Sequence, residues 1–252
     1  MPCVATLESL HEAIAEFAVT DLSLVIEPPA LAAAQRSLDT SGLLLLGEVH
    51  GVRENPLLIR ALMQELGLTR LALEWLDDLA PVIRNFLASG TLTDHEALWS
   101  GDGRITAGHL ATLAERATAG PLDLILFDGI MGVGWSWSQH DEAMAERILA
   151  AVPRGARTLA VAGNAHTPTS HTDLGVPLGA HLARRRPGVR EICISYAGGC
   201  FYNLKPRQFR QSTKRRRQLR LSEHGSELIL DLPLAKEAIV PHRPQPWPTL
   251  AW

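Results

Sequence analysis

The sequence lacks the features that mark secreted, zinc-stapled or membrane-spanning proteins. It has three cysteines among 252 residues, too few and too scattered for a disulfide framework, and no Cys-x-x-Cys pair that would indicate structural zinc. No apolar run approaches the roughly 20 residues of a membrane span. The N-terminal segment MPCVATLESLHEAIAEF carries two glutamates and lacks a basic start followed by an apolar core, so it is not predicted to be a signal peptide. We therefore expect a cytoplasmic protein that does not bind a membrane.

Two further absences narrow the function. There is no Gly-x-Ser-x-Gly segment, which disfavours a serine hydrolase with a nucleophile elbow. The formal net charge of -3 gives no general reason to expect nucleic acid as a partner. Basic residues gather only at 205–220, where few aromatic residues accompany them, and we interpret this segment as a solvated strap. The oligomeric state is left open.

Short, uniformly apolar segments alternate with segments of helical periodicity along the middle of the chain. Such segments predict strands at 42–47, 71–74, 122–127, 158–162 and 191–196, with a last strand at 227–232. Helical periodicity predicts helices at 54–67, 77–87, 107–119, 139–152 and 176–185, and the first forty residues also read as helical. Strands that are apolar throughout are buried on both faces. The fold class is therefore α/β, a mostly parallel sheet with helices on both faces, in a single domain.

The chain divides into three parts within that domain. We predict an N-terminal helical extension at 1–40 and an α/β core at 41–204, with the site at the carboxyl ends of the strands. The remainder, 205–252, is predicted to hold the basic strap, the final strand and a proline-rich tail.

Chemically capable side chains follow four of the predicted strands. They are Glu48 and His50 after the first strand, Glu74 after the second, Asp128 after the third, and Asn164 and His166 after the fourth. Ligands of open α/β sheets bind in the crevice outside the carboxyl ends of the strands. Loops are polar in general, which explains any one of these residues, but it explains poorly why His and Glu recur. We therefore expect these groups to converge.

The two histidines belong to matching motifs. Gly47-Glu-Val-His50 and Gly163-Asn-Ala-His166 both read Gly-x-x-His directly after an apolar strand. Glycine lets the backbone turn sharply at the end of the strand, so the histidine projects over the edge of the sheet. One such motif is a weak signal, and two in equivalent positions are a good one.

With these motifs the sequence resembles the superfamily that joins erythromycin esterase-like proteins, ChaN-like haem-binding uptake proteins and Tiki/TraB proteins. Its hallmarks are two Gly-x-x-His motifs and a pair of glutamates, which match 47–50 with Glu54, Glu74 in LALEW, and 163–166. The segment HDEAMAERI, 140–148, resembles a family helix that often begins Arg-Asp; Asp141 fits and His140 departs from that pattern. The segment GVPLGAHL, 175–182, resembles the stretch after the second histidine. The resemblance covers roughly residues 40 to 200.

The resemblance implies hydrolytic chemistry in some branches, with a His-activated water that opens an ester or lactone. In this chain His50 is then the general base, and Glu48 or Glu74 orients it. His166, with Asn164, polarises the carbonyl or stabilises an oxyanion. We expect a small-molecule substrate or ligand and no cofactor.

The same groups leave two alternatives. His50, His166, Glu48 and Glu74 also make a plausible divalent metal site, as the Tiki-like branch implies. The ChaN-like branch implies haem binding, for which an axial Tyr, His or Met is needed; the two tyrosines are Tyr196 and Tyr202.

Other candidates have a structural and a functional interpretation. His140 and Asp141 either cap a helix or face the cleft, and Glu54 is either a first-turn acid or a binding group. Trp135 and Trp137 lie in a glycine-rich loop that either lines a lid for an apolar substrate or packs against the core. Three further histidines are interpreted as ordinary surface or core residues, namely His109, His181 and His224.

Overall fold

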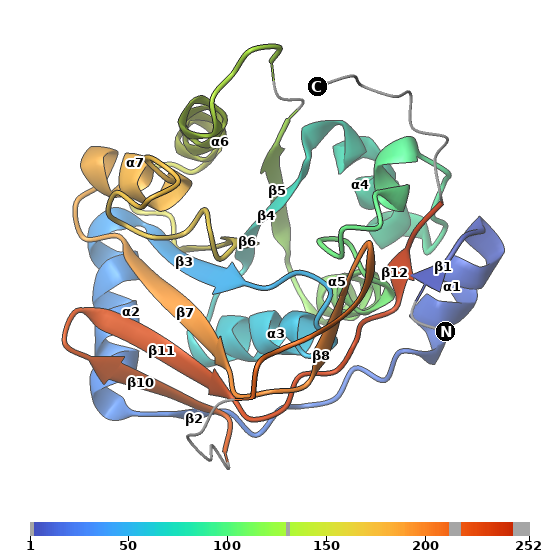
Figure 1. The fold of residues 1–252 in the computed structure, drawn as a ribbon, viewed down its shortest axis with the longest axis horizontal. Coiled ribbons are helices and arrows are strands. Elements are labelled where there is room, and N and C mark those ends of the chain that lie inside the picture. Colours follow the sequence, from blue (N-terminus) through green and yellow to red (C-terminus); the bar gives the residue numbers. More distant parts are fainter. Residues whose placement is uncertain (1–2, 130–131, 212–217, 244–252) are drawn as a thin grey trace.

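The computed structural model describes residues 3–129, 132–211 and 218–243 and consists of a large sheet between two layers of helices (Figure 1). The sheet has eight strands in the order β2-β10-β11-β7-β3-β6-β4-β5. All neighbouring strands are parallel except β10 and β11, which are antiparallel. The predicted α/β class, with a mostly parallel sheet in a single domain, is confirmed.

The strands of the large sheet are β2 (Val25–Ile26), β3 (Leu43–Glu48), β4 (Arg70–Leu76), β5 (Asp123–Asp128), β6 (Thr158–Gly163), β7 (Arg190–Tyr196), β10 (Arg220–His224) and β11 (Glu227–Leu232). Two small sheets flank it: β1 (Cys3–Val4) with β12 (Val240–Pro241), and the hairpin of β8 (Cys200–Asn203) and β9 (Lys205–Gln208). The helices are α1 (Leu7–Glu16), α2 (Pro28–Ser41), α3 (Asn55–Glu65), α4 (Ala80–Ser89), α5 (Ala107–Ala119), α6 (Trp137–Ala151) and α7 (Leu178–Arg185), with 3₁₀ turns η1 (Asp77–Leu79) and η2 (Glu96–Trp99).

The four leucines of β3 show why the central strands are apolar on both faces. Leu44 and Leu46 point into the larger core cluster, which also contains side chains of α2, α3 and α5. Leu43 and Leu45 point the other way, into a second cluster with α6 and α7. All four are fully buried, and Figure 1 shows α6 and α7 on one side of β3 with α3 on the other. Side chains alternate across a strand, so burial on both faces requires an uninterrupted apolar run.

The N-terminal helices begin and end as their sequences dictate. Thr6 caps α1 through its hydroxyl, which accepts a hydrogen bond from the Ser9 amide. Helix α2 begins at Pro28 and ends at Ser41, and the capping residue Gly42 has a φ of 80°, the left-handed conformation that glycine adopts without strain. The inward face of α2 belongs to the larger core cluster, with Leu38 fully buried.

Some elements differ from the sequence-based expectation. The first forty residues hold α1 and α2, as expected, and also β2, which pairs with β10. The basic segment 205–220, expected to be a solvated strap, contributes β9 and the first residue of β10. Strand β10, RLSEH, carries too few apolar residues to stand out, and its position depends on pairing with β11. Residues 244–252 of the proline-rich tail lie outside the described residues. Within the described part of the chain, no helix is long and apolar enough to cross a membrane.

Candidate active site

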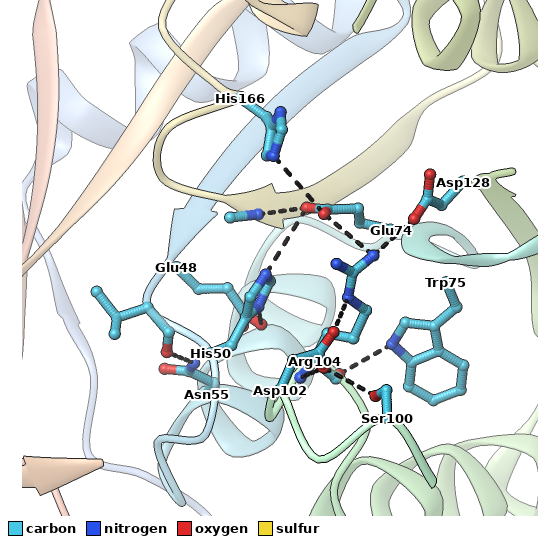
Figure 2. A network of polar contacts seen from close by, with 12 residues as sticks. Glu48, His50, Asn55, Glu74, Trp75, Ser100, Asp102, Arg104, Asp128 and His166 are labelled. Carbon is cyan, nitrogen blue, oxygen red and sulfur yellow. Dashed lines mark hydrogen bonds and ion pairs between the residues drawn. The ribbon is translucent and has the colours of Figure 1, made fainter. Parts of the chain in front are cut away.

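The carboxyl ends of four adjacent strands, β3, β6, β4 and β5, form the floor of the site. Glu48 and Asp128 are the last residues of β3 and β5, Glu74 lies near the end of β4, and His166 follows β6. Because parallel strands end at the same edge, these side chains meet there (Figure 2). The arrangement places a carboxylate between two imidazoles.

Glu74 is the central carboxylate of the site. It is 3% exposed, and its Oε2 accepts a hydrogen bond from the Gly163 amide at 2.6 Å. His50 Nε2 lies 3.9 Å from Oε2, and His166 Nε2 lies 3.8 Å from Oε1. Figure 2 shows the two rings on opposite sides of this carboxylate. Glu74 therefore acts on both histidines through its charge.

Glu48 orients His50 through a hydrogen bond to the ring. The Nδ1 atom lies 3.2 Å from Glu48 Oε1, which leaves Nε2 facing Glu74 and the cleft. Burial alone lowers the pKa of His50, but the hydrogen bond to Glu48 and the charge of Glu74 outweigh it and raise that pKa above its usual value. Glu48 thus sets the tautomer and orientation of the ring.

His166 has a carboxylate partner of its own, Asp141. The Nδ1 atom lies 2.8 Å from Asp141 Oδ1, and the fully buried Asp141 also accepts from the Leu178 amide at 2.7 Å. Burial lowers the pKa of His166, and the hydrogen bond to Asp141 together with the charge of Glu74 raises it overall. Asp141 therefore caps α7 while it orients His166, and Ser136 is the residue that caps α6.

Trp137 covers the outer face of His166. The two rings are stacked, with centroids 5.2 Å apart and an interplanar angle of 21°. Trp135, two residues earlier, is 41% exposed on the loop before α6. Of the two tryptophans predicted for this loop, Trp137 is the first residue of α6 and contacts His166.

Arg104 is the residue of the site that sequence reasoning missed. Its NH1 atom lies 2.6 Å from Asp128 Oδ2 and 3.4 Å from Glu74 Oε1, and its Nε lies 2.8 Å from Asp102 Oδ2. Burial opposes the charge of the guanidinium, but the three carboxylates raise the pKa of Arg104 further above its ordinary value. Arg104 follows no strand, so the strand-end rule could not find it. The only local signal is the turn GDGR, whose Gly103 has a φ of 87° and contacts the backbone of Gly51.

Asp128 links Arg104 to His140. His140 Nε2 lies 2.8 Å from Asp128 Oδ1, and the Gly129 amide donates to the same oxygen at 2.8 Å. Burial raises the pKa of Asp128, but His140 and Arg104 outweigh it and lower that pKa. The hydrogen bond to Asp128 raises the pKa of His140 despite partial burial. His140 thus belongs to the site's charge network.

Two predicted site residues are held elsewhere. Glu54 accepts a hydrogen bond from the Lys236 amide at 2.9 Å, and burial raises the pKa of its carboxyl. Asn164 has an exposed side chain. Its backbone N–H donates to the Glu48 carbonyl at 2.8 Å, which fixes the backbone between the two motifs. Neither side chain contacts a histidine of the site in the described structure.

The structure also shows how the candidate metal ligands and the two tyrosines named for haem are arranged. Among the described residues, no set of three or more His, Cys, Asp or Glu side chains is arranged to hold a metal ion. The Tyr196 hydroxyl accepts from the Val49 amide at 2.9 Å and donates to Asn55 Oδ1 at 3.2 Å, and burial raises its pKa well above the usual value. Tyr202 is buried and pairs with His242. Both tyrosines serve internal hydrogen bonds.

Comparison with known proteins finds likeness in fold alone. No family model matches the sequence, and no curated protein matches it. A solved succinoglycan biosynthesis protein superposes with a TM-score of 0.60 at 11% identity over 93% of this chain and 98% of that one. A protein from Bacillus cereus superposes with a TM-score of 0.57 at 9% identity over 95% of this chain and all of that one.

Several bacterial toxin structures match more weakly. RRSP, a MARTX toxin effector domain from Vibrio vulnificus, gives a TM-score of 0.44 at 24% identity over 75% of this chain and 38% of that chain. This chain spans less than two fifths of the toxin chains that head the matches. The TM-scores of 0.60 and 0.57 show a fold shared with the succinoglycan biosynthesis protein and the Bacillus cereus protein, and the function is left to be argued from the site.

Proposed function

We propose that the protein is a hydrolase of the erythromycin esterase-like type, in which His50 activates a water molecule that attacks an ester, lactone or related acyl bond. One observation supports this above all. Two histidines face the same buried glutamate through Nε2, and each is oriented at Nδ1 by a carboxylate of its own. Pairing with an orienting carboxylate is how proteins fix the tautomer of a catalytic imidazole.

His50 is the general base of the proposed reaction. Glu48 accepts a hydrogen bond from Nδ1–H, so the neutral ring presents a lone pair at Nε2. A water proton moves to Nε2 as the water oxygen forms its bond to the acyl carbon. The carbonyl π electrons move to oxygen and create an oxyanion. The proton then passes to the leaving oxygen as the acyl–oxygen bond breaks.

His166 stabilises the oxyanion. The pKa values of both site histidines are raised, and we assign the proton that they compete for to His166, which then carries N–H groups at both nitrogens. One of them donates to Asp141, and the Nε2–H is free to donate to the developing negative charge. The two histidines then take opposite roles in the same cleft, as acid–base pairs of enzymes commonly do.

Glu74 and Arg104 control the charge around both rings. Arg104 NH1 lies 3.4 Å from Glu74 Oε1, and the charge of Glu74 contributes to the raised pKa of both imidazoles. Asp128 and Asp102 hold Arg104 in place. These residues position the reacting groups and are not assigned a bond to substrate.

We also propose that the enzyme is cytoplasmic, acts on a small molecule and has no nucleic-acid partner. It is proposed to belong to the erythromycin esterase-like, ChaN-like and Tiki superfamily and to require no cofactor. The net charge of -3 supports the absence of a nucleic-acid partner, and the two Gly-x-x-His motifs support membership in the superfamily.

The test is hydrolysis of a panel of p-nitrophenyl esters and lactones by the wild type and by His50→Gln. We expect kcat to fall by about 10² to 10⁴, the typical contribution of a positioned general base. His224→Gln is the matched control, because His224 lies at the end of β10 and bonds Ser222 instead of the site. Undiminished hydrolysis by a folded His50→Gln variant would remove His50 from the mechanism.

A further inference from the structure

A small cavity lies beside His50 in the candidate site. Its volume is about 10 Å³, close to that of one water-sized sphere. Among the residues that line it are Glu48, His50, Trp75, Arg104 and His109. Such a cavity holds water when it offers polar partners and remains empty when its walls are apolar. The question is whether polar groups with unused hydrogen-bonding capacity face it.

Glu48 supplies an unused acceptor. Its side chain is buried, and Oε1 is engaged by His50 at 3.2 Å. The other oxygen, Oε2, is buried and has no hydrogen-bond partner among the described residues. A buried carboxylate oxygen without a hydrogen-bond donor is destabilising, because it has lost its bonds to water without replacement. Glu48 Oε2 therefore needs a hydrogen-bond donor.

His109 supplies an unused donor. It is 3% exposed, and its Nδ1 lies 3.0 Å from the Thr106 hydroxyl. That hydroxyl already accepts from the His109 amide at 3.1 Å, and no other hydrogen-bond acceptor for its proton is found among the described residues, so we assign the hydroxyl as donor to Nδ1. The ring proton then resides on Nε2. Nε2 makes no hydrogen bond within the described structure.

The surroundings of His109 hold its ring in place. Burial lowers the pKa of His109, and Glu48, His50 and His109 line the same cavity. The edge of the ring meets Trp75, with centroids 6.0 Å apart and an interplanar angle of 90°. Trp75 is itself held by a hydrogen bond to the Arg104 carbonyl at 3.0 Å.

We propose that this cavity binds one water molecule, which accepts a hydrogen bond from His109 Nε2–H and donates one to Glu48 Oε2. His109 is then a positioning residue that acts on His50 through the water and Glu48. The binding site follows from the cavity, the acceptor and the donor. Its catalytic consequence rests on the proposed function.

The water site is tested without any substrate. A high-resolution crystal structure of the full chain should show an ordered oxygen within about 3.2 Å of both Glu48 Oε2 and His109 Nε2. His109→Phe, which keeps an aromatic ring against Trp75 and lacks the N–H group, should lose this oxygen. A wild-type cavity without solvent, or with solvent that contacts neither atom, overturns the proposal.

The positioning role is tested by kinetics of a matched pair of variants. His109→Leu removes the donor, and His109→Gln keeps an amide N–H close to the position of Nε2. We expect His109→Leu to lower kcat by about tenfold with KM unchanged, and His109→Gln to recover activity to within about threefold of the wild type. Equal activity of His109→Leu and wild type, or equal losses in both variants, overturns the role. If the wild type hydrolyses no ester, the proposed function fails while the crystallographic result still decides the water site.

Discussion

Arg104 and the three carboxylates around it form the most concentrated charge cluster of the described site. The guanidinium contacts Glu74, Asp102 and Asp128, of which Glu74 and Asp128 are buried. Breaking a buried ion pair leaves an uncompensated charge, which costs more than the pair itself contributes. The stability of the site therefore depends on this one cation.

We predict that Arg104→Met lowers the free energy of unfolding by about 3 kcal/mol. Arg104→Lys should lose less, because it keeps the charge and gives up the forked geometry. Urea denaturation measures both. The control is Arg147→Met, which breaks a more exposed pair with Asp77 and should cost less than about 1 kcal/mol. Equal stability of Arg104→Met and wild type would contradict the structure.

Asp141 is the second residue whose substitution separates orientation from folding. Asp141→Asn keeps an oxygen that can accept from the Leu178 amide and removes the negative charge beside His166. We predict a folded variant in which the pKa of His166 falls, measured by NMR titration of the imidazole. Ester hydrolysis should fall by about 10², the effect of one lost oxyanion donor. An unchanged His166 titration would show that the Asp141 charge does not control this ring.

At the scale of elements, Asp128 and His140 join the end of β5 to the first turns of α6. The ion pair bridges a connection that includes the glycine-rich loop, and its strength depends on the protonation of both partners. Because the folded-state pKa of His140 is raised, its contribution to stability is complete below the unfolded value of 6.5 and disappears as the pH rises through the folded pKa. The lowered pKa of Asp128 makes its contribution complete above 3.8 and lost as the pH falls through the folded value.

We therefore predict a pH window for this connection. The difference in unfolding free energy between wild type and His140→Leu should be larger at about pH 5 than at about pH 9, by roughly 1 kcal/mol. Urea titrations at the two pH values measure this difference. His224→Leu is the control, because His224 lies in β10, toward the opposite edge of the sheet from β5. A difference that is the same at both values would mean that the pair does not bridge the two elements in solution.

At the scale of the whole molecule, the sheet holds the four strand ends and the helices of both faces supply their partners. Helix α6 brings Asp141 and His140, and the turn before α5 brings Arg104. The same assembly concerns the metal-dependent and haem-binding alternatives. In both site histidines Nδ1 faces a carboxylate, which leaves Nε2 as the nitrogen that could bind a metal ion or a haem iron.

The two alternatives are separated by one preparation of purified, untagged protein. On the proposed mechanism, we predict esterase activity that is unchanged after chelator treatment, no stoichiometric divalent metal and no Soret absorbance. Metal analysis, an ultraviolet-visible spectrum and an activity assay on the same sample measure these. Activity that is lost with chelator and restored by manganese or zinc would favour the metal-dependent alternative. A haem band would favour the carrier.

The sequence by itself determined the α/β fold and the strand ends on which Glu48, His50, Glu74, Asp128 and His166 lie. Apolar runs and glycine turns are local, and sheet polarity alone brings the ends of parallel strands together. The tertiary structure alone decided that Arg104 joins them, that Asp141 orients His166, and that Glu54 turns to the Lys236 amide. The physical reason is that these contacts join segments far apart in the chain, as does the backbone hydrogen bond between Gly51 and Gly103. Their partners follow from how loops close over the sheet, which no local pattern records.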